Sequence, residues 1–226
     1  MGKRDGNKFE RVDKDYYSTI DPSCMVPAFV DRVRGLKYAE PCYGEGHLED
    51  LLMDVATCVW RSDIRPTVGS SLVKDATKLN IDDLQEADVC ISNPPYQWSM
   101  LKPLLDHLPT QKPTWLLLPA DYMHNIRMGS YMERCSTVIA VGRMYWFESV
   151  WKEVQLLTDD LDRFKIEDWF WERSVVYGDG TIRYVGWFCP KRNIPTEKEA
   201  VKGVSNMCWY KFNKWHLGAT EFIGRS

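Results

Sequence analysis

Apolar positions along the chain predict short buried strands that alternate with helices. Apolar residues at 26, 29, 30 and 33, and again at 48, 51, 52 and 55, have the spacing of helices that lie on a core. Further helices are expected at about 97 to 108 and 122 to 134. Short, nearly continuous apolar runs predict strands at 36 to 41, 57 to 63, 70 to 75, 87 to 92, 114 to 119, 136 to 142 and 182 to 189.

This alternation predicts an α/β, doubly wound, Rossmann-like fold, because parallel strands covered by helices on both faces are apolar throughout. The first helix is expected to start at Asp21 as N-cap, with Pro22 in its first turn, and to stop at Gly35. The acidic, tryptophan-rich piece TDDLDRFKIEDWFWERS breaks the alternation, so we expect an excursion at about 143 to 181. We divide the chain into a polar tail (1 to 14), a main domain (15 to 189) and a small extension (190 to 226).

Composition narrows the class of protein. With 226 residues and 44% hydrophobic content, the chain can bury one sizeable core. No apolar run is long enough to cross a bilayer, and we expect a cytoplasmic protein without a membrane partner. The seven cysteines form no C-x-x-C pair and the four histidines lack metal-ligand spacing, so the sequence predicts reduced thiols and no metal site.

The net charge is -3, but charged residues are distributed unevenly along the chain. Residues 1 to 14 carry +2 and residues 190 to 226 carry +4, and basic ends on an acidic body can bring a polyanion to chosen surfaces. In the extension, Lys211 and Lys214 alternate with aromatic residues at 209, 210, 212 and 215. These aromatic residues either contact bases beside lysine-bound phosphates or seal the core, and the sequence leaves both open.

A glycine turn lies between a predicted strand and helix in YAEPCYGEGHLEDLL. Gly44 and Gly46 allow the backbone to pass close to a ligand. Asp63 ends the next strand seventeen residues after Gly46, where an acidic side chain can accept hydrogen bonds from ribose hydroxyls. Glu40, at the end of the first strand, would repel a diphosphate. A cationic nucleoside such as S-adenosylmethionine (SAM) fits this arrangement better than a dinucleotide.

Three segments together resemble the class I SAM-dependent methyltransferases, and in particular the DNA methyltransferases that act on adenine N6. EPCYGEG is similar to the family's cofactor loop, NPPY to its catalytic motif, and DYYSTIDPS to a segment that precedes the loop in some phage and bacterial members. The resemblance covers residues 15 to about 145, and the motif order is similar to the gamma arrangement. It implies a seven-stranded, mostly parallel sheet with YVGWFCP as the seventh strand, and suggests a phage enzyme.

The resemblance also implies the site residues. Asp63 would hold the ribose, Ile64 would pack on the adenine ring of the cofactor, and Asp75 would accept from its amine, although an aspartate after a strand is commonly a helix cap. The residues implied to contact SAM are Tyr17, Thr19, Glu40, Pro41, Gly44, Gly46, Asp63, Ile64, Asp75 and Asn93. The residues expected to contact the substrate are Tyr96, Trp98, Lys211 and Lys214.

Each residue of the motif Asn93, Pro94, Pro95 and Tyr96 has a chemical task in this interpretation. The side-chain carbonyl of Asn93 and the backbone carbonyl of Pro94 accept from the adenine amine, which localises its lone pair toward the sulfonium methyl. The prolines stiffen the segment and remove N–H groups. Tyr96 offers a flat face to a base that has left its stack.

Other substrates fit the same chemistry. Guanine or adenine amines in ribosomal RNA and a glutamine amide in release factors are also planar, conjugated amines. The cofactor loop, the Y-x-T segment and the expected lack of an extra N-terminal helical domain favour DNA adenine as partner. A non-catalytic subunit that binds SAM or nucleic acid remains an alternative, and a homodimer is left open.

Overall fold

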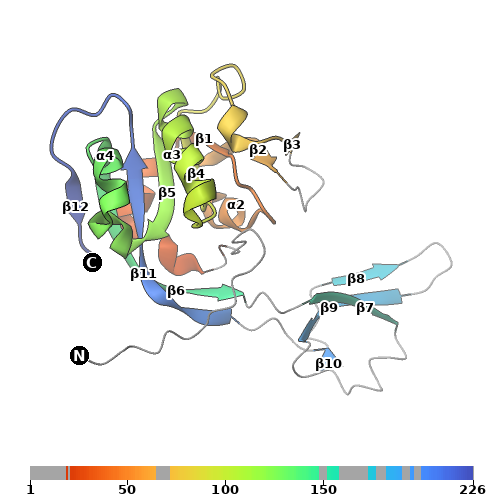
Figure 1. Ribbon diagram of the computed structural model, residues 1–226. Helices are drawn as coiled ribbons and strands as arrows, with labels where there is room; N and C mark the ends of the chain where they lie inside the picture. Colours follow the sequence, from red (N-terminus) through yellow and green to blue (C-terminus); the bar gives the residue numbers. More distant parts are fainter. Residues whose placement is uncertain are drawn as a thin grey trace, which may run out of the picture. The chain divides into compact units, whose positions relative to one another are not determined.

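The computed structural model describes residues 19, 21–64, 72–147, 152–157, 173–176, 182–189, 194–195 and 200–225. The chain divides into two compact units, one made of residues 1–146 with 202–226 and the other of residues 147–201 (Figure 1). Tyr17 and the tryptophans at 151, 169 and 171 lie outside the described residues. None of the helices in the described ranges is long and apolar enough to span a membrane.

The first unit is built on an eight-stranded sheet. In spatial order its strands are β12 (Glu221–Ile223), β6 (Cys135–Phe147), β11 (Ala200–Phe212), β5 (Thr114–Pro119), β4 (Val89–Ser92), β1 (Lys37–Glu40), β2 (Thr57–Asp63) and β3 (Leu72–Val73). Strands β3, β2, β1, β4 and β5 pair in parallel, β12 pairs in parallel with β6, and β11 is antiparallel to β5. The predicted α/β, mostly parallel fold is confirmed.

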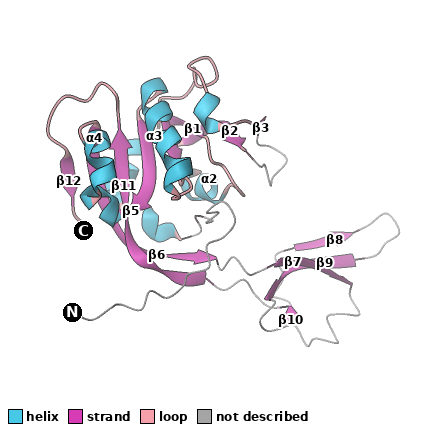
Figure 2. Ribbon diagram, viewed as in Figure 1, coloured by secondary structure: helices cyan, strands magenta, loops and turns pink. Residues whose placement is uncertain are grey.

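Helices cover both faces of this sheet (Figure 2). They are η2 (Pro22–Cys24), α1 (Pro27–Val33), α2 (His47–Leu52), η3 (Ala76–Lys78), α3 (Trp98–Gln111), η4 (Ala120–His124), η5 (Ile126–Met128) and α4 (Gly129–Met132). Alternate residues of β5 point to opposite faces: Trp115 and Leu117 pack with α1 and α2, whereas Leu116 and Leu118 pack with α3 and α4. The strand is buried up to its last residue, Pro119, because it faces helices on both sides.

The first predicted helix is split in two. Asp21 caps the short turn η2 by accepting from the backbone N–H of Ser23 at 2.8 Å, and α1 then starts at Pro27. Proline has no N–H to donate to the preceding turn, so it suits the first position of a new helix better than the interior of a longer one.

The identity of the seventh strand was predicted wrongly. Residues 182–189 form β9 of the second unit, and β11 takes the central antiparallel position beside β5. Trp209 of β11 is fully buried, stacks on Phe29 with ring centres 4.1 Å apart, and donates its indole N–H to the carbonyl of Cys24 at 2.8 Å. Trp209, Tyr210 and Phe212 of the expected extension at 190–226 therefore seal the core, which is one of the two alternatives above, whereas Trp215 is 74% exposed. Strand β12 adds an eighth strand where seven were expected.

The second unit is a four-stranded sheet. Its strands β7 (Lys152–Leu157), β8 (Arg173–Val176), β9 (Ile182–Cys189) and β10 (Ile194–Pro195) pair antiparallel. It contains most of the excursion expected at 143–181 and extends beyond it, because residues 182–189 join the same sheet.

Candidate active site

The predicted site lies where the strand order changes direction. Strand β1 is flanked by β2 on one side and β4 on the other, so the connections after β1 and β4 leave the sheet in opposite directions. Open α/β sheets bind ligands at the carboxyl ends of such strands. Glu40 is the last residue of β1, and Asn93 follows the last residue of β4.

The glycine turn between β1 and α2 requires glycine at two positions. Gly44 and Gly46 have φ angles of 57° and 84°, in the left-handed region. A Cβ on Gly46 would lie 2.5 Å from the hydroxyl oxygen of Tyr43. The backbone N–H of Gly44 donates to the carboxylate of Asp63 at 3.0 Å. The structure therefore brings the turn and the end of β2 together, as the sequence predicted for a ribose site.

Glu40 is a buried carboxylate at this turn. Its exposed fraction is 2%, and its Oε2 atom has no hydrogen-bond partner among the described residues. Burial, followed by the nearby charge of Glu49, raises its pKa well above the ordinary value, while the guanidinium of Arg61 acts in the opposite direction. An unpaired buried acceptor of this kind is stabilised by a cationic partner.

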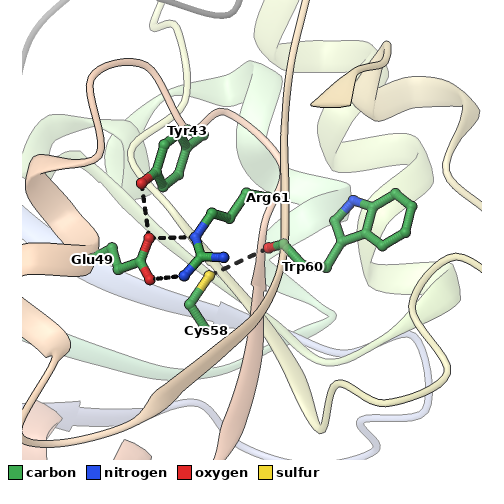
Figure 3. A network of polar contacts seen from close by, with 5 residues as sticks. All are labelled: Tyr43, Glu49, Cys58, Trp60 and Arg61. Atoms are coloured by element: carbon green, nitrogen blue, oxygen red, sulfur yellow. Dashed lines mark hydrogen bonds and ion pairs between the residues drawn. The ribbon is translucent and has the colours of Figure 1, made fainter. Parts of the chain in front are cut away.

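A polar network beside Glu40 holds the turn (Figure 3). The carboxylate of Glu49 on α2 accepts from the hydroxyl of Tyr43 at 2.8 Å and from two guanidinium nitrogens of Arg61 on β2. The Arg61 pairing is the main cause that lowers the pKa of Glu49. Arg61 also stands opposite Glu40 in the register of β1 and β2.

Sequence reasoning missed Glu49 and Arg61. Both are charged residues in ordinary helix and strand positions, and their pairing depends on how α2 packs against β2. A glutamate in the first turn of the helix after the glycine loop was the only local signal, and it is also a common helix-start residue.

The predicted catalytic motif contacts Thr19, which precedes the glycine turn in the sequence. The side-chain amide nitrogen of Asn93 donates to Thr19 Oγ1 at 2.9 Å, and Asn93 Oδ1 accepts from the hydroxyl of Tyr96 at 2.6 Å. Thr19 is 5% exposed. The carbonyl of Tyr96 accepts from the hydroxyl of Tyr122 at 2.7 Å. These bonds fix the orientation of the Asn93 amide and join it to the segment resembling the family's Y-x-T motif.

Other predicted residues lie around the same edge. Pro41 is buried directly after Glu40, Pro94 is buried and Pro95 is half-buried. Ile64, at the end of β2, is 62% exposed and has the apolar surface expected beneath an adenine ring. Trp98 opens α3 directly after the motif and meets the ring of Tyr131 edge-on with centres 6.1 Å apart.

Asp75 acts as the cap of η3. Its Oδ1 accepts from the backbone N–H of Thr77 at 2.9 Å and from the Thr77 hydroxyl at 2.7 Å. These bonds to Thr77 lower its pKa despite partial burial. Asp75 is therefore a helix cap, which was the alternative considered for it. Its contact with the adenine of the cofactor stays a prediction.

Lys211 and Lys214 lie away from Asn93, at the opposite end of the parallel strands. Lys211 is in register with Trp115 at the start of β5, and the backbone N–H of Lys214 donates to Pro109 near the end of α3. Both positions belong to the amino end of β5, whereas Asn93 follows the carboxyl end of β4. Burial lowers the pKa of Lys211, whose ammonium lies 5.5 Å from the ring centre of Trp115. Lys211 alternates with buried residues of β11, whereas Lys214 follows the strand and is exposed, and the predicted contact of both with nucleic acid stays a prediction.

No family model and no curated protein matches this chain. Solved structures match it over most of its length at low similarity. A candidate RNA methyltransferase from Pyrococcus horikoshii is 10% identical over 82% of this chain and 78% of its own, with a TM-score of 0.40. The YcgJ protein of Bacillus subtilis is 6% identical over 83% and 97%, with a TM-score of 0.40.

A SAM-dependent O-methyltransferase from Thermotoga maritima is 10% identical over 87% of this chain and 66% of its own, with a TM-score of 0.39. Structural similarity with TM-scores of 0.40 or less does not support a conclusion about activity. The fold is established by the strand order, and the function is argued from the site.

Proposed function

We propose that this protein is a SAM-dependent methyltransferase that transfers a methyl group to the exocyclic N6 amine of adenine in DNA. The observation that carries the proposal is the pairing of two features at the carboxyl ends of the adjacent strands β1 and β4. One is the buried carboxylate of Glu40 at a glycine turn, and the other is the oriented amide of Asn93.

The cofactor would lie along the ends of β1 and β2. Glu40 would pair with the ammonium of the methionine moiety, which explains why a carboxylate with an unpaired oxygen is kept buried there. The backbone at Gly44 and Gly46 lets the ligand approach, Asp63 would accept from the ribose hydroxyls, and Ile64 would pack on the adenine ring.

The amine would be activated by carbonyl oxygens. Asn93 Oδ1 and the backbone oxygen of Pro94 would accept its two hydrogens, which turns the nitrogen lone pair toward the sulfonium methyl. The nitrogen–carbon bond forms as the carbon–sulfur bond breaks, the bonding pair goes to sulfur, and S-adenosylhomocysteine leaves. The proton leaves the nitrogen after transfer. The Asn93 bond to Thr19 supports this scheme because the amide nitrogen lies toward Thr19 and the oxygen lies toward Tyr96.

Tyr96 would hold the target base. It follows the two prolines, its ring packs against the buried core on both sides of the sheet, and its hydroxyl bonds to Asn93. A base outside its duplex can stack on such a ring. Guanine in RNA, the release-factor glutamine, or a non-catalytic binding subunit are the competing assignments.

The test supplies labelled SAM with genomic DNA, total RNA and release factor in parallel reactions, followed by mass spectrometry of nucleosides and peptides. The proposal predicts N6-methyladenine in DNA. Label found only in protein, or as methylguanine in RNA, would reassign the substrate. SAM binding without transfer to any of the three would favour the non-catalytic subunit.

A further inference from the structure

The loop after β5, residues 120–128, is held beside the catalytic motif by hydrogen bonds and packing contacts. Tyr122 donates to the carbonyl of Tyr96 at 2.7 Å. The hydroxyl of Tyr210 lies within hydrogen-bond distance of the carbonyls of Pro119 and Ala120, at 3.1 and 3.2 Å. At the other end of the loop, Met128 is 1% exposed and packs in the core. The loop is therefore held at its start, at its middle and at its end.

This fastened loop presents Ile126 to solvent. Ile126 is 94% exposed, and the side chain of Asn125 fixes the turn by accepting from the backbone N–H of Arg127 at 3.0 Å. The guanidinium of Arg127 lies 5.9 Å from the ring centre of Trp98, two residues after Tyr96. The isoleucine thus projects from a turn with one contact to the catalytic motif, at Tyr96, and a second contact to Trp98 at the start of α3.

Single exposed apolar side chains are common, so the position of Ile126 carries the argument. Among the described residues, the other exposed large apolar side chains are Met53, Ile64, Leu72, Val73, Ile81, Trp215, Leu217 and Phe222. Ile64, Leu72 and Val73 belong to the β2 and β3 side, where the cofactor is proposed to bind. Phe222 is on β12, four strands from β4. Of this set, Ile126 alone is on the loop that hydrogen-bonds to the motif.

We propose that Ile126 is a wedge that enters the DNA base stack at the place vacated by the target adenine. The inference rests on the proposed function and deepens it by assigning duplex DNA as the substrate form. Moving a base out of a duplex leaves a gap and breaks stacking, and proteins fill such gaps with apolar side chains. Because the loop is already held in place beside Tyr96, inserting the Ile126 side chain into DNA costs little further conformational entropy of the loop.

The charged side chains of this loop favour a contact between its tip and the phosphate backbone of DNA. Arg127, next to Ile126, and His124 are exposed, and an arginine there can contact a phosphate of the duplex. Asp121 is the exposed carboxylate of this loop, and it lies at its start, beside the strand end.

The experiment compares native and heat-denatured samples of one genomic DNA, so no recognition sequence need be known. Initial rates of labelled methyl incorporation are measured for the wild-type protein, Ile126→Ala, and the matched control Ile81→Ala. Ile81 is half-exposed and lies in the turn before β4, away from the motif.

With native DNA, Ile126→Ala should lose about tenfold in rate, since a wedge offsets part of the cost of moving the base out of the duplex. With denatured DNA its rate should change much less, because no stack has to be opened. Ile81→Ala should match the wild type on both. Equal rates of Ile126→Ala and wild type on native DNA, or an equal loss on both DNA forms, would overturn the wedge while leaving the methyltransferase proposal standing.

A wild-type protein that methylates only denatured DNA would also overturn the wedge. Absence of incorporation into either form would instead refute the DNA proposal, and the wedge with it.

Discussion

The side-chain amide of Asn93 donates to the hydroxyl oxygen of Thr19 at 2.9 Å, although the two residues are 74 positions apart. The bond holds the amide nitrogen of Asn93 toward Thr19. The amide oxygen accepts from the hydroxyl of Tyr96 at 2.6 Å, and its second lone pair is the acceptor that the proposed amine activation requires.

Thr19→Val keeps the shape of the side chain and removes the acceptor. We expect the rate of methyl transfer at saturating SAM to fall about fivefold, the equivalent of one lost hydrogen bond of about 1 kcal/mol. Thr19→Ser, which keeps the hydroxyl, should retain most of the rate. Steady-state kinetics with DNA separate the outcomes, and a Thr19→Val variant as active as the wild type would show that the bond does not position Asn93.

Glu40→Gln should stabilise the cofactor-free protein and weaken SAM binding. Because burial raises the pKa of Glu40 well above its ordinary value, the folded state is favoured when this carboxyl is protonated. That contribution is present at low pH and is lost as the pH rises through the raised pKa. Thermal unfolding should therefore show a gap between variant and wild type that widens with pH. Glu86→Gln, at an exposed position, should show no such gap.

SAM binding should also release a proton from Glu40. An ammonium placed against this carboxylate favours its charged form, so a protonated Glu40 must ionise when the cofactor binds. Calorimetric titrations in buffers of different ionisation enthalpy measure this release, and Glu40→Gln should abolish it. Unchanged proton release in the variant would remove Glu40 from the methionine site.

Glu49→Gln should loosen the glycine turn. It breaks the pair with Arg61 and weakens the bond from Tyr43. Since both charged side chains are partly exposed, we expect a loss of about 1–2 kcal/mol in the free energy of unfolding. The pKa of Glu49 is lowered, so its contribution exists at neutral pH and disappears as the pH falls through the lowered value. Denaturant unfolding near neutral pH should separate variant from wild type, and the two curves should converge in acid.

Gly46→Ala tests the backbone of the turn. Alanine at a φ of 84° costs about 1–2 kcal/mol, and its Cβ would collide with Tyr43. The variant should be less stable and bind SAM more weakly. Gly129→Ala is the matched control because a Cβ there meets nothing within 4 Å. Equal unfolding midpoints for the two variants would mean that the turn relaxes without strain.

The sequence predicted the parts of the fold that depend on local pattern. Continuous apolar runs located β2 and β5 at their observed bounds, and the motifs predicted the strand ends at Glu40, Asp63 and Asn93. It could not choose the antiparallel strand, because residues 182–189 and 200–212 both have strand composition. The choice depends on Trp209 meeting Phe29, a contact between residues far apart in the chain.

Site residues that belong to short sequence motifs could be predicted, whereas contacts that depend on tertiary packing could not. The glycine turn and NPPY are short motifs, so their residues could be named. The Glu49–Arg61 pair and the Asn93–Thr19 bond form only when separate elements dock. Lys211 shows a pattern that the sequence leaves ambiguous, because a lysine among the buried aromatic residues of a strand has the same sequence pattern as a nucleic-acid contact.

Asn93→Ala provides the most direct test of the central claim, which is that the amide at the end of β4 activates an amine for transfer from SAM bound over the end of β1. Methyl incorporation into DNA and the SAM dissociation constant are measured together for this variant, the wild type and Asn80→Ala, whose exposed amide lies in the turn before β4. We predict that Asn93→Ala loses detectable transfer and keeps SAM affinity within about threefold, a change below 1 kcal/mol. Transfer by Asn93→Ala at the rate of Asn80→Ala would contradict the account.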